Sequence, residues 1–323
     1  MTISVTIPVF NEAANLRRLF EQLTPVLGSL HRPWEVIFVN DGSSDGSAEV
    51  LDELAASDVR VKVIHFRRNA GQTAAMMAGF EHARGEIIVP MDADLQNDPQ
   101  DIPLLLAKLS EGFDVCSGWR KDRQDHPVRR KLPSRVANWL ISKVSGVRLH
   151  DYGCSLKAYR RDVIKGVRLY GEMHRFIPIY ASWLGAKVTE VPVRHHPRTA
   201  GASSYGLERV VKVVLDLVVV VFLDRYAQKP IYVFGGFGLL NFVVSLVAGA
   251  WALYLKFWAG ISFILTPLPL LVVMSAITGV MCVLLGLVAE LVTRGWHESR
   301  GKSTYIIGET RNLESGTVDS GAG

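Results

Sequence analysis

Cysteine is scarce in this chain, with three residues among 323. Cys116, Cys154 and Cys282 are widely separated and form no Cys-x-x-Cys pair, which argues against a zinc site or a disulfide framework. We expect them to be packing residues in a reducing compartment. The motifs Gly-x-Gly-x-x-Gly and Gly-x-x-x-x-Gly-Lys-Ser/Thr are also absent, so the usual phosphate cradles are excluded. A nucleotide site would have to neutralise phosphates in another way.

The N-terminal residues lack the marks of a secretory signal. Residues 1–10 contain no basic segment and no cleavage site, and their pattern predicts a β-strand. We therefore expect no secretion, and membrane insertion would rely on segments near the C-terminus.

Two stretches near the C-terminus lack charge. They run from about Ile231 to Leu255 and from about Leu265 to Val292, with no Lys, Arg, Asp or Glu before Glu290. Because about 20 apolar residues span a hydrocarbon core, both predict transmembrane helices, joined as a hairpin by a short link. The alternative is a buried hairpin in a soluble core, but such helices normally carry a polar stripe.

Basic residues predict the orientation of this hairpin. The link holds only Lys256, whereas five cations flank the two spans: Arg225, Lys229, Arg294, Arg300 and Lys302. The positive-inside rule then places both flanks, and with them the N-terminal part, in the cytoplasm. We expect residues 231–292 to form the two spans, residues 206–230 an interfacial helix, and residues 293–323 a cytoplasmic tail that is disordered from Gly308 onward.

Up to about Gly118, short β-branched runs alternate with helical patterns, which is typical of a mainly parallel sheet with crossover helices. The predicted strands are Ser4–Pro8, Trp34–Asn40, Val61–Phe66, Ile87–Met91 and Asp114–Gly118. The predicted helices are Glu12–Leu27, Ser47–Ala56, Gly71–Ala83 and Pro99–Glu111. Ligands of such sheets bind beyond the carboxyl ends of the strands.

Polar residues follow four consecutive predicted strands at their carboxyl ends, and this points to one site. They are Asn11, Glu12, Asp41, Gly42, Ser43, Arg67, Asn69, Asp92 and Asp94. Asp92 and Asp94, with Gln96 two residues further, offer oxygen atoms on alternate positions after an apolar strand. Oxygen ligands suit Mg²⁺ or Mn²⁺, which bridge to substrate phosphates.

An ordered series of motifs resembles the family-2 inverting glycosyltransferases of GT-A fold, which are Rossmann-like with a mainly parallel sheet. The motifs are Pro8-Val9-Phe10-Asn11-Glu12, Asn40-Asp41-Gly42-Ser43-Ser44-Asp45, Arg68-Asn69-x-Gly71 and Asp92-Ala93-Asp94-Leu95-Gln96. Within this family the chain is similar, to about Arg300, to polyprenyl-phosphate glycosyltransferases. These include the dolichyl-phosphate mannose synthases and the undecaprenyl-phosphate glucosyl- and formamidoarabinosyltransferases.

The resemblance implies roles for single residues. The residues implied to bind the donor nucleotide are Pro8, Val9, Asn11, Glu12, Asp41, Arg68 and Asp92. The implied ligands of Mg²⁺ or Mn²⁺ are Asp92, Asp94 and Gln96. The implied catalytic groups are Asp94, Asp151 and Arg198, and the groups implied to bind the acceptor phosphate are Arg120, Arg129, Arg130 and Ser203.

The acceptor side contains two further motifs. Asp151-Tyr152-Gly153-Cys154-Ser155 resembles the formamidoarabinosyltransferase branch, which favours a UDP-linked donor of that sugar or of glucose. The stretch 198–205 resembles a loop that closes over the phosphates, but Ser204 stands where many relatives have Lys, so one cation is missing. Cations and apolar residues at helical spacing predict an amphipathic helix at about 126–147 on an anionic membrane surface, within a catalytic domain of residues 1–205.

The sequence therefore predicts inverting transfer of a sugar from a nucleotide sugar to polyprenyl phosphate at a membrane, for cell-envelope glycan or lipid modification. Two alternatives are a processive polysaccharide synthase, for which two spans are too few without oligomerisation, and an inactive nucleotide-sugar-binding module. The cations of the predicted amphipathic helix would also suit binding of nucleic acid, but the transmembrane hairpin argues against such a partner. Small residues in the spans are compatible with a homo-oligomer.

Overall fold

The computed structural model describes residues 1–121, 141–142, 145–165, 173–197, 231–298 and 307–313. The chain divides into two compact units, of which the first comprises Met1–Leu217 with Ser303–Gly323 and the second Val218–Lys302. The predicted boundary at residue 205, the predicted interfacial helix 206–230 and most of the predicted amphipathic helix 126–147 lie outside the described residues.

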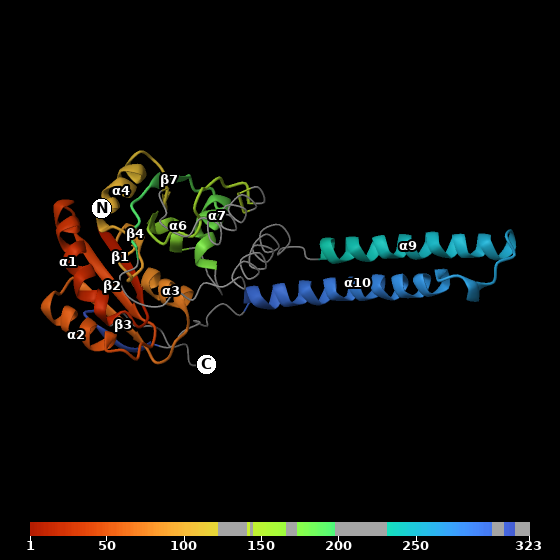
Figure 1. The fold of residues 1–323 in the computed structure, drawn as a ribbon, viewed down its shortest axis with the longest axis horizontal. Helices are drawn as coiled ribbons and strands as arrows, with labels where there is room; N and C mark the ends of the chain where they lie inside the picture. The colour runs from red at the N-terminus through yellow and green to blue at the C-terminus, as the bar shows by residue number, and fades with distance from the viewer. Residues whose placement is uncertain (122–140, 143–144, 166–172, 198–230, 299–306, 314–323) are drawn as a thin grey trace. The chain divides into compact units, whose positions relative to one another are not determined.

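The first unit is built on one mixed sheet of eight strands in the order β7-β5-β6-β4-β1-β2-β3-β8 (Figure 1). The strands are β1 (Ile3–Val9), β2 (Trp34–Asn40), β3 (Val61–Phe66), β4 (Ile87–Pro90), β5 (Val115–Trp119), β6 (Lys157–Arg160), β7 (Val188–Pro192) and β8 (Ile307–Arg311). Strands β4, β1, β2 and β3 pair in parallel, as expected. Strand β6 lies antiparallel between β4 and β5, so the carboxyl end of β5 points in the same direction as those of β1 to β4.

Helices cover both faces of the parallel strands. They are α1 (Ala13–Ser29), α2 (Ser47–Ser57), α3 (Gln72–His82), the 3₁₀ helix η1 (Pro99–Asp101), α4 (Ile102–Ser110), α6 (Arg161–Lys165), η3 (Met173–Phe176) and α7 (Ile177–Trp183). Figure 1 shows α1 and α2 on one side of β1 to β3 and α3 on the other. The predicted strands and helices up to β5 match these bounds within two residues, except that the predicted helix at 99–111 begins as η1.

The core follows the period-two alternation of the strands. Ile3, Val5, Ile7 and Val9 of β1 are fully buried and cluster with the leucines of α1 at 16, 19, 23 and 27. The alternate residue Thr6 faces α3, where a β-carbon at Gly79 would lie 3.0 Å from the Thr6 Cβ atom. This missing side chain lets α3 approach the sheet closely and fixes the start of α3 beside the carboxyl ends of β1 and β2.

The prediction of disorder from Gly308 onward is wrong for the first part of that segment. Residues Ile307–Arg311 form β8, which pairs antiparallel with β3 at the edge of the sheet. A strand at an edge leaves backbone groups unpaired, and β8 satisfies those of β3. Three of the five side chains of β8 are exposed, so the strand needs no alternation of apolar residues. Its composition therefore did not reveal it as a strand. Residues 314–323 lie outside the described residues.

The second unit contains two long apolar helices, α9 (Ile231–Phe257) and α10 (Leu268–Glu298), with the short helix η4 (Phe263–Leu265) between them. The segments Tyr232–Phe257 and Leu268–Ala289 are long and apolar enough to cross a membrane. Only 11% and 17% of their most apolar windows is buried, whereas the core helix of a soluble protein would be mostly buried. The exposed apolar surface therefore favours lipid as the surroundings.

The two helices pack closely where both lack a side chain. A β-carbon at Gly238 would lie 2.9 Å from the Gly279 carbonyl oxygen, and one at Gly279 would lie 3.0 Å from the Gly238 carbonyl oxygen. The Ser245 hydroxyl donates a hydrogen bond of 2.9 Å to the Val272 carbonyl on the other helix. These small residues thus serve contacts within the hairpin, and the predicted homo-oligomer stays a prediction.

Candidate active site

The loops that follow β1 and β2 are held together by hydrogen bonds. The Asn11 amide N–H donates to the Ser43 hydroxyl at 3.0 Å, and the Asn11 side-chain oxygen accepts from the Ser44 amide at 2.9 Å. The Asp45 carboxylate accepts from the Ala13 amide at 3.0 Å. Asn11 has a positive φ of 55°, a conformation that asparagine tolerates better than most residues. These hydrogen bonds join residues 11–13, after β1, to residues 43–45, after β2. We call this joined pair of loops the rim.

Asp41 lies at the bottom of this rim and is only 3% exposed. Its carboxylate accepts hydrogen bonds from the Ala70 amide at 2.6 Å and the Gly71 amide at 2.9 Å, both in the loop that follows β3. The Asn69 side chain donates to the Asp41 carbonyl at 3.2 Å. Burial raises the pKa of Asp41, and the two amide bonds oppose this rise. The structure therefore holds Asp41 between the ends of β2 and β3.

Gly42 permits the close approach of these two loops. Its φ is +68°, and a β-carbon would lie 2.6 Å from the Asn69 nitrogen and 2.7 Å from the Arg68 carbonyl carbon. Only glycine fits such a contact with backbone. The backbone of Arg68 therefore contributes to the rim, and its side chain is exposed.

The other predicted donor-binding residues differ in placement. Val9 is fully buried in the core, and its carbonyl oxygen accepts the Asp41 amide N–H at 2.8 Å. Pro8 is partly exposed at the same strand end. Glu12 is partly exposed, and its amide donates to the Ser47 hydroxyl at 3.1 Å. Val9 thus contacts Asp41 through its backbone carbonyl, while the side chains of Pro8 and Glu12 are partly exposed to solvent.

The acidic motif after β4 keeps the alternation that the sequence predicts. Asp92, Asp94 and Gln96 are partly exposed, whereas the residues between them are buried. The Asp94 carboxylate accepts from the Gln96 amide at 3.1 Å, and the Asp92 carboxylate accepts from the Gln72 side chain at 2.9 Å. Leu95 has a positive φ of 60°, which is rare for a bulky residue and marks this turn as strained.

These three side chains fit a hard divalent cation that keeps water and phosphate ligands. They supply two carboxylates and one amide oxygen, and oxygen atoms are the ligands that Mg²⁺ and Mn²⁺ take. Among the residues that the structure describes, no group of three or more His, Cys, Asp or Glu side chains is gathered.

The acceptor motif is organised around Asp151. Its carboxylate accepts two hydrogen bonds from Arg120, 2.7 Å from Nε and 3.0 Å from Nη2. Asp151 also accepts the Gly153 amide at 3.0 Å, and a β-carbon at Gly153 would lie 3.2 Å from Arg120 Nη2. Arg120 follows β5, so this pair stands at the carboxyl end of a fifth strand.

The stretch 157–161, which follows the acceptor motif and shares its resemblance, contains Lys157, a buried cation for which the sequence predicted no role. It is 4% exposed, and its ammonium donates to the backbone carbonyls of Tyr152 and Cys154. Burial lowers the pKa of Lys157 to about 8, and the carboxylates of Asp151 and Asp92 act against this fall. A lysine inside the short run 157–160 carries no sequence signal that separates it from a surface lysine.

Hydrogen bonds connect the three groups of residues. Gln72, which binds Asp92, follows Gly71, which binds Asp41. The Asn97 side chain donates to the Ser155 hydroxyl at 2.7 Å, and thereby joins the acidic motif to the acceptor motif. The structure thus brings Asp41, Asp92 and Asp151 into one connected region at the carboxyl ends of the strands.

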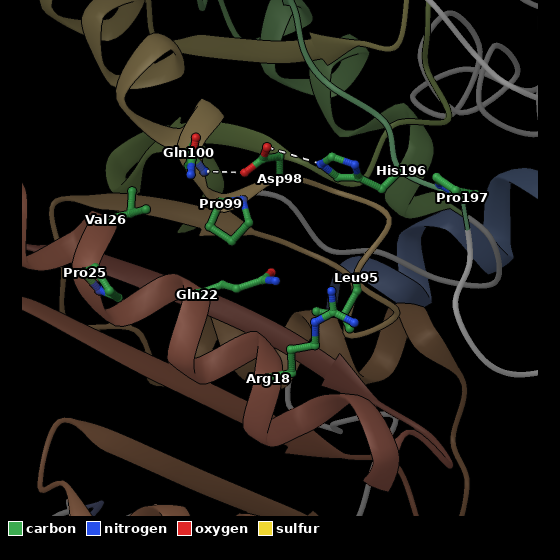
Figure 2. A pocket seen from close by; sticks show the side chains of 10 residues that line it. All are labelled: Arg18, Gln22, Pro25, Val26, Leu95, Asp98, Pro99, Gln100, His196 and Pro197. Carbon is green, nitrogen blue, oxygen red and sulfur yellow. Dashed lines mark hydrogen bonds and ion pairs between the residues drawn. The ribbon is translucent and has the colours of Figure 1, made fainter.

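Figure 2 shows a hollow between α1 and the segment that leads into η1. It has a volume of about 520 Å³ and is lined by Arg18, Gln22, Pro25, Val26, Leu95, Asp98, Pro99, Gln100, His196 and Pro197. The Asp98 carboxylate accepts from the Gln100 amide at 2.9 Å and lies 3.2 Å from His196 Nε2. Leu95 belongs to this lining, whereas Asp94 and Gln96 do not. The hollow is therefore not the predicted donor site.

Four predicted site residues lie outside the described residues. They are Arg129, Arg130, Arg198 and Ser203. The chain just before Arg198 is described, and the His196 amide donates to the Gln96 carbonyl at 2.9 Å. The contact shows that the segment leading into the predicted phosphate loop lies against the acidic motif.

Comparison with known proteins identifies the family of this chain. The model of the family "Glycosyl transferase family 2" matches residues 4–168. The dodecaprenyl-phosphate galacturonate synthase of Rhizobium johnstonii is 38% identical over 95% of this chain and 92% of that protein. An undecaprenyl-phosphate 4-deoxy-4-formamido-L-arabinose transferase of Shewanella sediminis is 35% identical over 94% of this chain and 91% of its own. The corresponding Salmonella choleraesuis protein is 36% identical over 97% and 94%.

Solved structures share the fold at low sequence identity. Glucosyl-3-phosphoglycerate synthase from Mycobacterium tuberculosis, solved with Mn²⁺, uridine diphosphate and phosphoglyceric acid, matches with a TM-score of 0.53 and 17% identity, over 69% of this chain and 78% of that one. Mannosyl-3-phosphoglycerate synthase from Rubrobacter xylanophilus matches with a TM-score of 0.54 and 16% identity, over 69% and 74%. The sheet, the motifs at its strand ends and the full-length relatives place this chain in glycosyl transferase family 2, with a GT-A-like fold.

Proposed function

We propose that this protein transfers a sugar from a nucleotide-sugar donor to polyprenyl phosphate, with inversion at the anomeric carbon. The observation that carries the proposal is the connected region of Asp41 after β2, Asp92 after β4, and Asp151, whose partner Arg120 follows β5. This region would place a nucleoside pocket at Asp41, a diphosphate site at Asp92 and an acceptor site at Asp151, side by side. Relatives at 35–38% identity are named for sugar transfer to dodecaprenyl or undecaprenyl phosphate, and they match the apolar helices as well.

The donor nucleoside is proposed to bind in the rim around Asp41. A buried carboxylate held by two backbone amides has a fixed direction, which suits recognition of an N–H group on a base. Asn11, Glu12 and Arg68 would border the nucleoside. We propose UDP as the nucleotide, and galacturonate joins formamidoarabinose and glucose as a candidate sugar because the first relative above is named for it.

The divalent ion is proposed to be held by Asp92, Asp94 and Gln96. When bound, Mg²⁺ or Mn²⁺ would neutralise the diphosphate that leaves with the nucleoside. Arg198 would supply a further charge, because a guanidinium binds phosphate oxygens at two points.

The acceptor phosphate is proposed to meet the Arg120 and Asp151 pair, together with Arg129, Arg130 and Ser203. A phosphate monoester has a second pKa of about 6, so at neutral pH it is already largely a dianion and needs little base catalysis. One of its oxygens would bond to the anomeric carbon as the bond from that carbon to the diphosphate oxygen breaks. Asp151 would then serve mainly to hold Arg120 in position, since both of its oxygens accept bonds from Arg120.

The site is proposed to face the cytoplasm from a membrane that α9 and α10 span twice. The flanks of the hairpin carry more cations than its link, which supports this orientation. A lipid phosphate stays near the headgroup layer, so the active site would have to bind the acceptor phosphate at that layer. Reactivity of single introduced cysteines in the link and at the N-terminus, probed in sealed inverted vesicles, would test this arrangement.

The function is tested by transfer of radiolabel to undecaprenyl phosphate by the purified full-length protein. A panel of UDP- and GDP-sugars is supplied with Mg²⁺ or Mn²⁺, and a chelator is the control. A glycolipid with one sugar from one donor, lost with chelator, is the expected product. No product from any donor would contradict the proposal, and a polymer would indicate a polysaccharide synthase.

A further inference from the structure

The C-terminal strand β8 pairs with β3, directly before the loop whose Ala70 and Gly71 amides bind Asp41. In the antiparallel pairing with β3, His65 stands opposite Glu309 and Phe66 opposite Ile307, with a shift of register between them. A β-carbon at Gly308 would lie 3.2 Å from the Arg67 Cγ atom and 3.3 Å from the His65 carbonyl oxygen. The strand therefore supports the chain just before the loop of Asn69 to Gly71.

A chain of polar contacts leads from β8 to the end of β2. Arg311 contacts the Asp52 carboxylate at 3.1 Å and 3.2 Å, and Asp52 lies 3.2 Å from His65 Nε2. His65 Nδ1 is 3.0 Å from the Asn40 side-chain nitrogen. The Asn40 side-chain oxygen accepts from the Ser43 amide at 3.0 Å. Ser43 in turn accepts from the Asn11 amide, so the chain reaches the rim of the donor site.

The direction of each hydrogen bond follows from chemistry. The Asn40 oxygen is occupied by the Ser43 N–H, so its NH₂ group faces His65 and can only donate. His65 Nδ1 must then accept, which leaves the proton on Nε2 to be donated to Asp52. Asp52 also receives the Arg311 guanidinium. Each contact in the chain therefore pairs a donor with an acceptor, and the directions of the bonds are mutually consistent.

Asn312, next to Arg311 in sequence, makes a second set of contacts that hold β8 in place. The Asn312 side chain donates to the Ala55 carbonyl at 2.7 Å and to the Val61 carbonyl at 2.9 Å. Asn40 is 3% exposed and the His65 side chain 13% exposed, so the inner part of the chain is shielded from water. Shielded hydrogen bonds hold geometry better than exposed ones.

We propose that β8 is a positioning element of the donor-nucleoside site, which acts through Arg311, Asp52 and His65 on the loop of Asn40 to Ser43. This inference rests on the proposed function, because it takes the rim around Asp41 to be the nucleoside pocket. Residues that follow the second apolar helix in the sequence are then required for donor affinity. Arg311, Asp52 and His65 touch neither donor nor acceptor.

The test compares variants of the full-length protein by steady-state kinetics with each substrate varied in turn. Arg311→Ala and Asp52→Asn should raise the KM of the nucleotide sugar about tenfold, while kcat and the KM of undecaprenyl phosphate change by less than about twofold. Arg311→Lys keeps the charge and should recover most of the donor affinity. Asp52→Asn preserves shape and serves if Arg311→Ala folds poorly.

Arg60→Ala is the matched control. Arg60 pairs with Asp58 at 2.7 Å and its side chain is 47% exposed, against 42% for Arg311, but its ion pair is not part of the chain to Asn40. The inference is overturned if Arg311→Ala and Asp52→Asn keep the wild-type donor KM. It is also overturned if both substrates lose affinity equally, or if Arg60→Ala has the same effect.

Failure of the proposed function gives a different result. The wild-type protein would then transfer no sugar from any donor. The same variants are in that case compared for binding of uridine diphosphate with Mn²⁺ by titration calorimetry. Weaker binding by Arg311→Ala than by Arg60→Ala supports the positioning role, whereas equal binding, or no binding by the wild type, overturns it.

Discussion

Arg120 and Asp151 form a two-point ion pair with distances of 2.7 Å and 3.0 Å, and their side chains are only 11% and 5% exposed. Thirty-one positions separate them in sequence, and the pair joins β5 to the acceptor motif. A guanidinium whose Nε and Nη2 atoms both donate to one carboxylate is held in a single orientation. Breaking a buried ion pair by removing one partner costs about 3–5 kcal/mol.

Asp151→Asn should therefore weaken use of the lipid acceptor more than use of the donor. The amide keeps the shape of the carboxylate but can accept only one of the two Arg120 bonds. We expect the KM of undecaprenyl phosphate to rise by about tenfold or more, with a smaller change in donor KM. A loss confined to kcat, with both KM values unchanged, would instead favour a role of Asp151 as a base.

Asp94→Ala should abolish turnover while the protein stays folded and bound to membranes. The change removes a proposed metal ligand at a partly exposed position outside the hydrophobic core. Asp98→Asn is the matched control, because asparagine keeps the oxygen that caps η1 and the residue lines the separate hollow. Turnover by Asp94→Ala near the wild-type rate would rule out the metal role of this residue.

Gly42→Ala should raise the donor KM through a backbone clash. The new β-carbon would lie 2.6 Å from the Asn69 nitrogen, so the loops around Asp41 must separate. Gly46→Ala is the control, because Gly46 also has a positive φ, 87°, but its nearest neighbour is a side-chain atom at 3.9 Å. Both changes should cost about 1–2 kcal/mol of stability from the left-handed backbone, and only Gly42→Ala should alter the donor KM.

Lys157 should make the stability of the catalytic unit increase with pH above about 8. Its pKa is lowered to about 8 by burial, against an ordinary value of 10.5. Between these values the unfolded chain keeps a proton that the folded protein has lost, so the free energy of unfolding rises with pH. Over this range the gain is on the order of 1–3 kcal/mol. Chemical unfolding of the wild type and Lys157→Met between pH 7 and about 10 measures it, and equal slopes would contradict the prediction.

Gly238→Ala should destabilise the apolar hairpin. The added methyl group would meet the Gly279 carbonyl oxygen at 2.9 Å and a Val283 methyl group at 2.8 Å. Overpacking of this kind costs about 1–3 kcal/mol. Gly236→Ala, where nothing lies within 4 Å, should leave the hairpin unchanged. Unfolding in mixed detergent micelles, followed by circular dichroism, would compare the two, and equal midpoints would show that the contact is unimportant.

The sequence by itself determined the parallel half of the sheet and the position of the acidic site. Strands such as Trp34–Asn40 and helices such as Ser47–Ser57 have local periods of apolar residues, and burial of one face enforces those periods in the fold. The polar residues after each strand were predicted to meet because parallel strands end at one edge. The two apolar helices followed from length and composition alone.

Only the tertiary structure decided the contacts between distant segments. Strand β8 has no apolar alternation, and its place depends on the unpaired edge of β3, about 250 positions away in sequence. The pairing of Arg120 with Asp151, the burial of Lys157 and the chain from Arg311 to Asn40 likewise depend on which segments are neighbours in space. Local sequence specifies periods and turns, whereas a polar contact of long range has no period and appears only when the sheet is assembled.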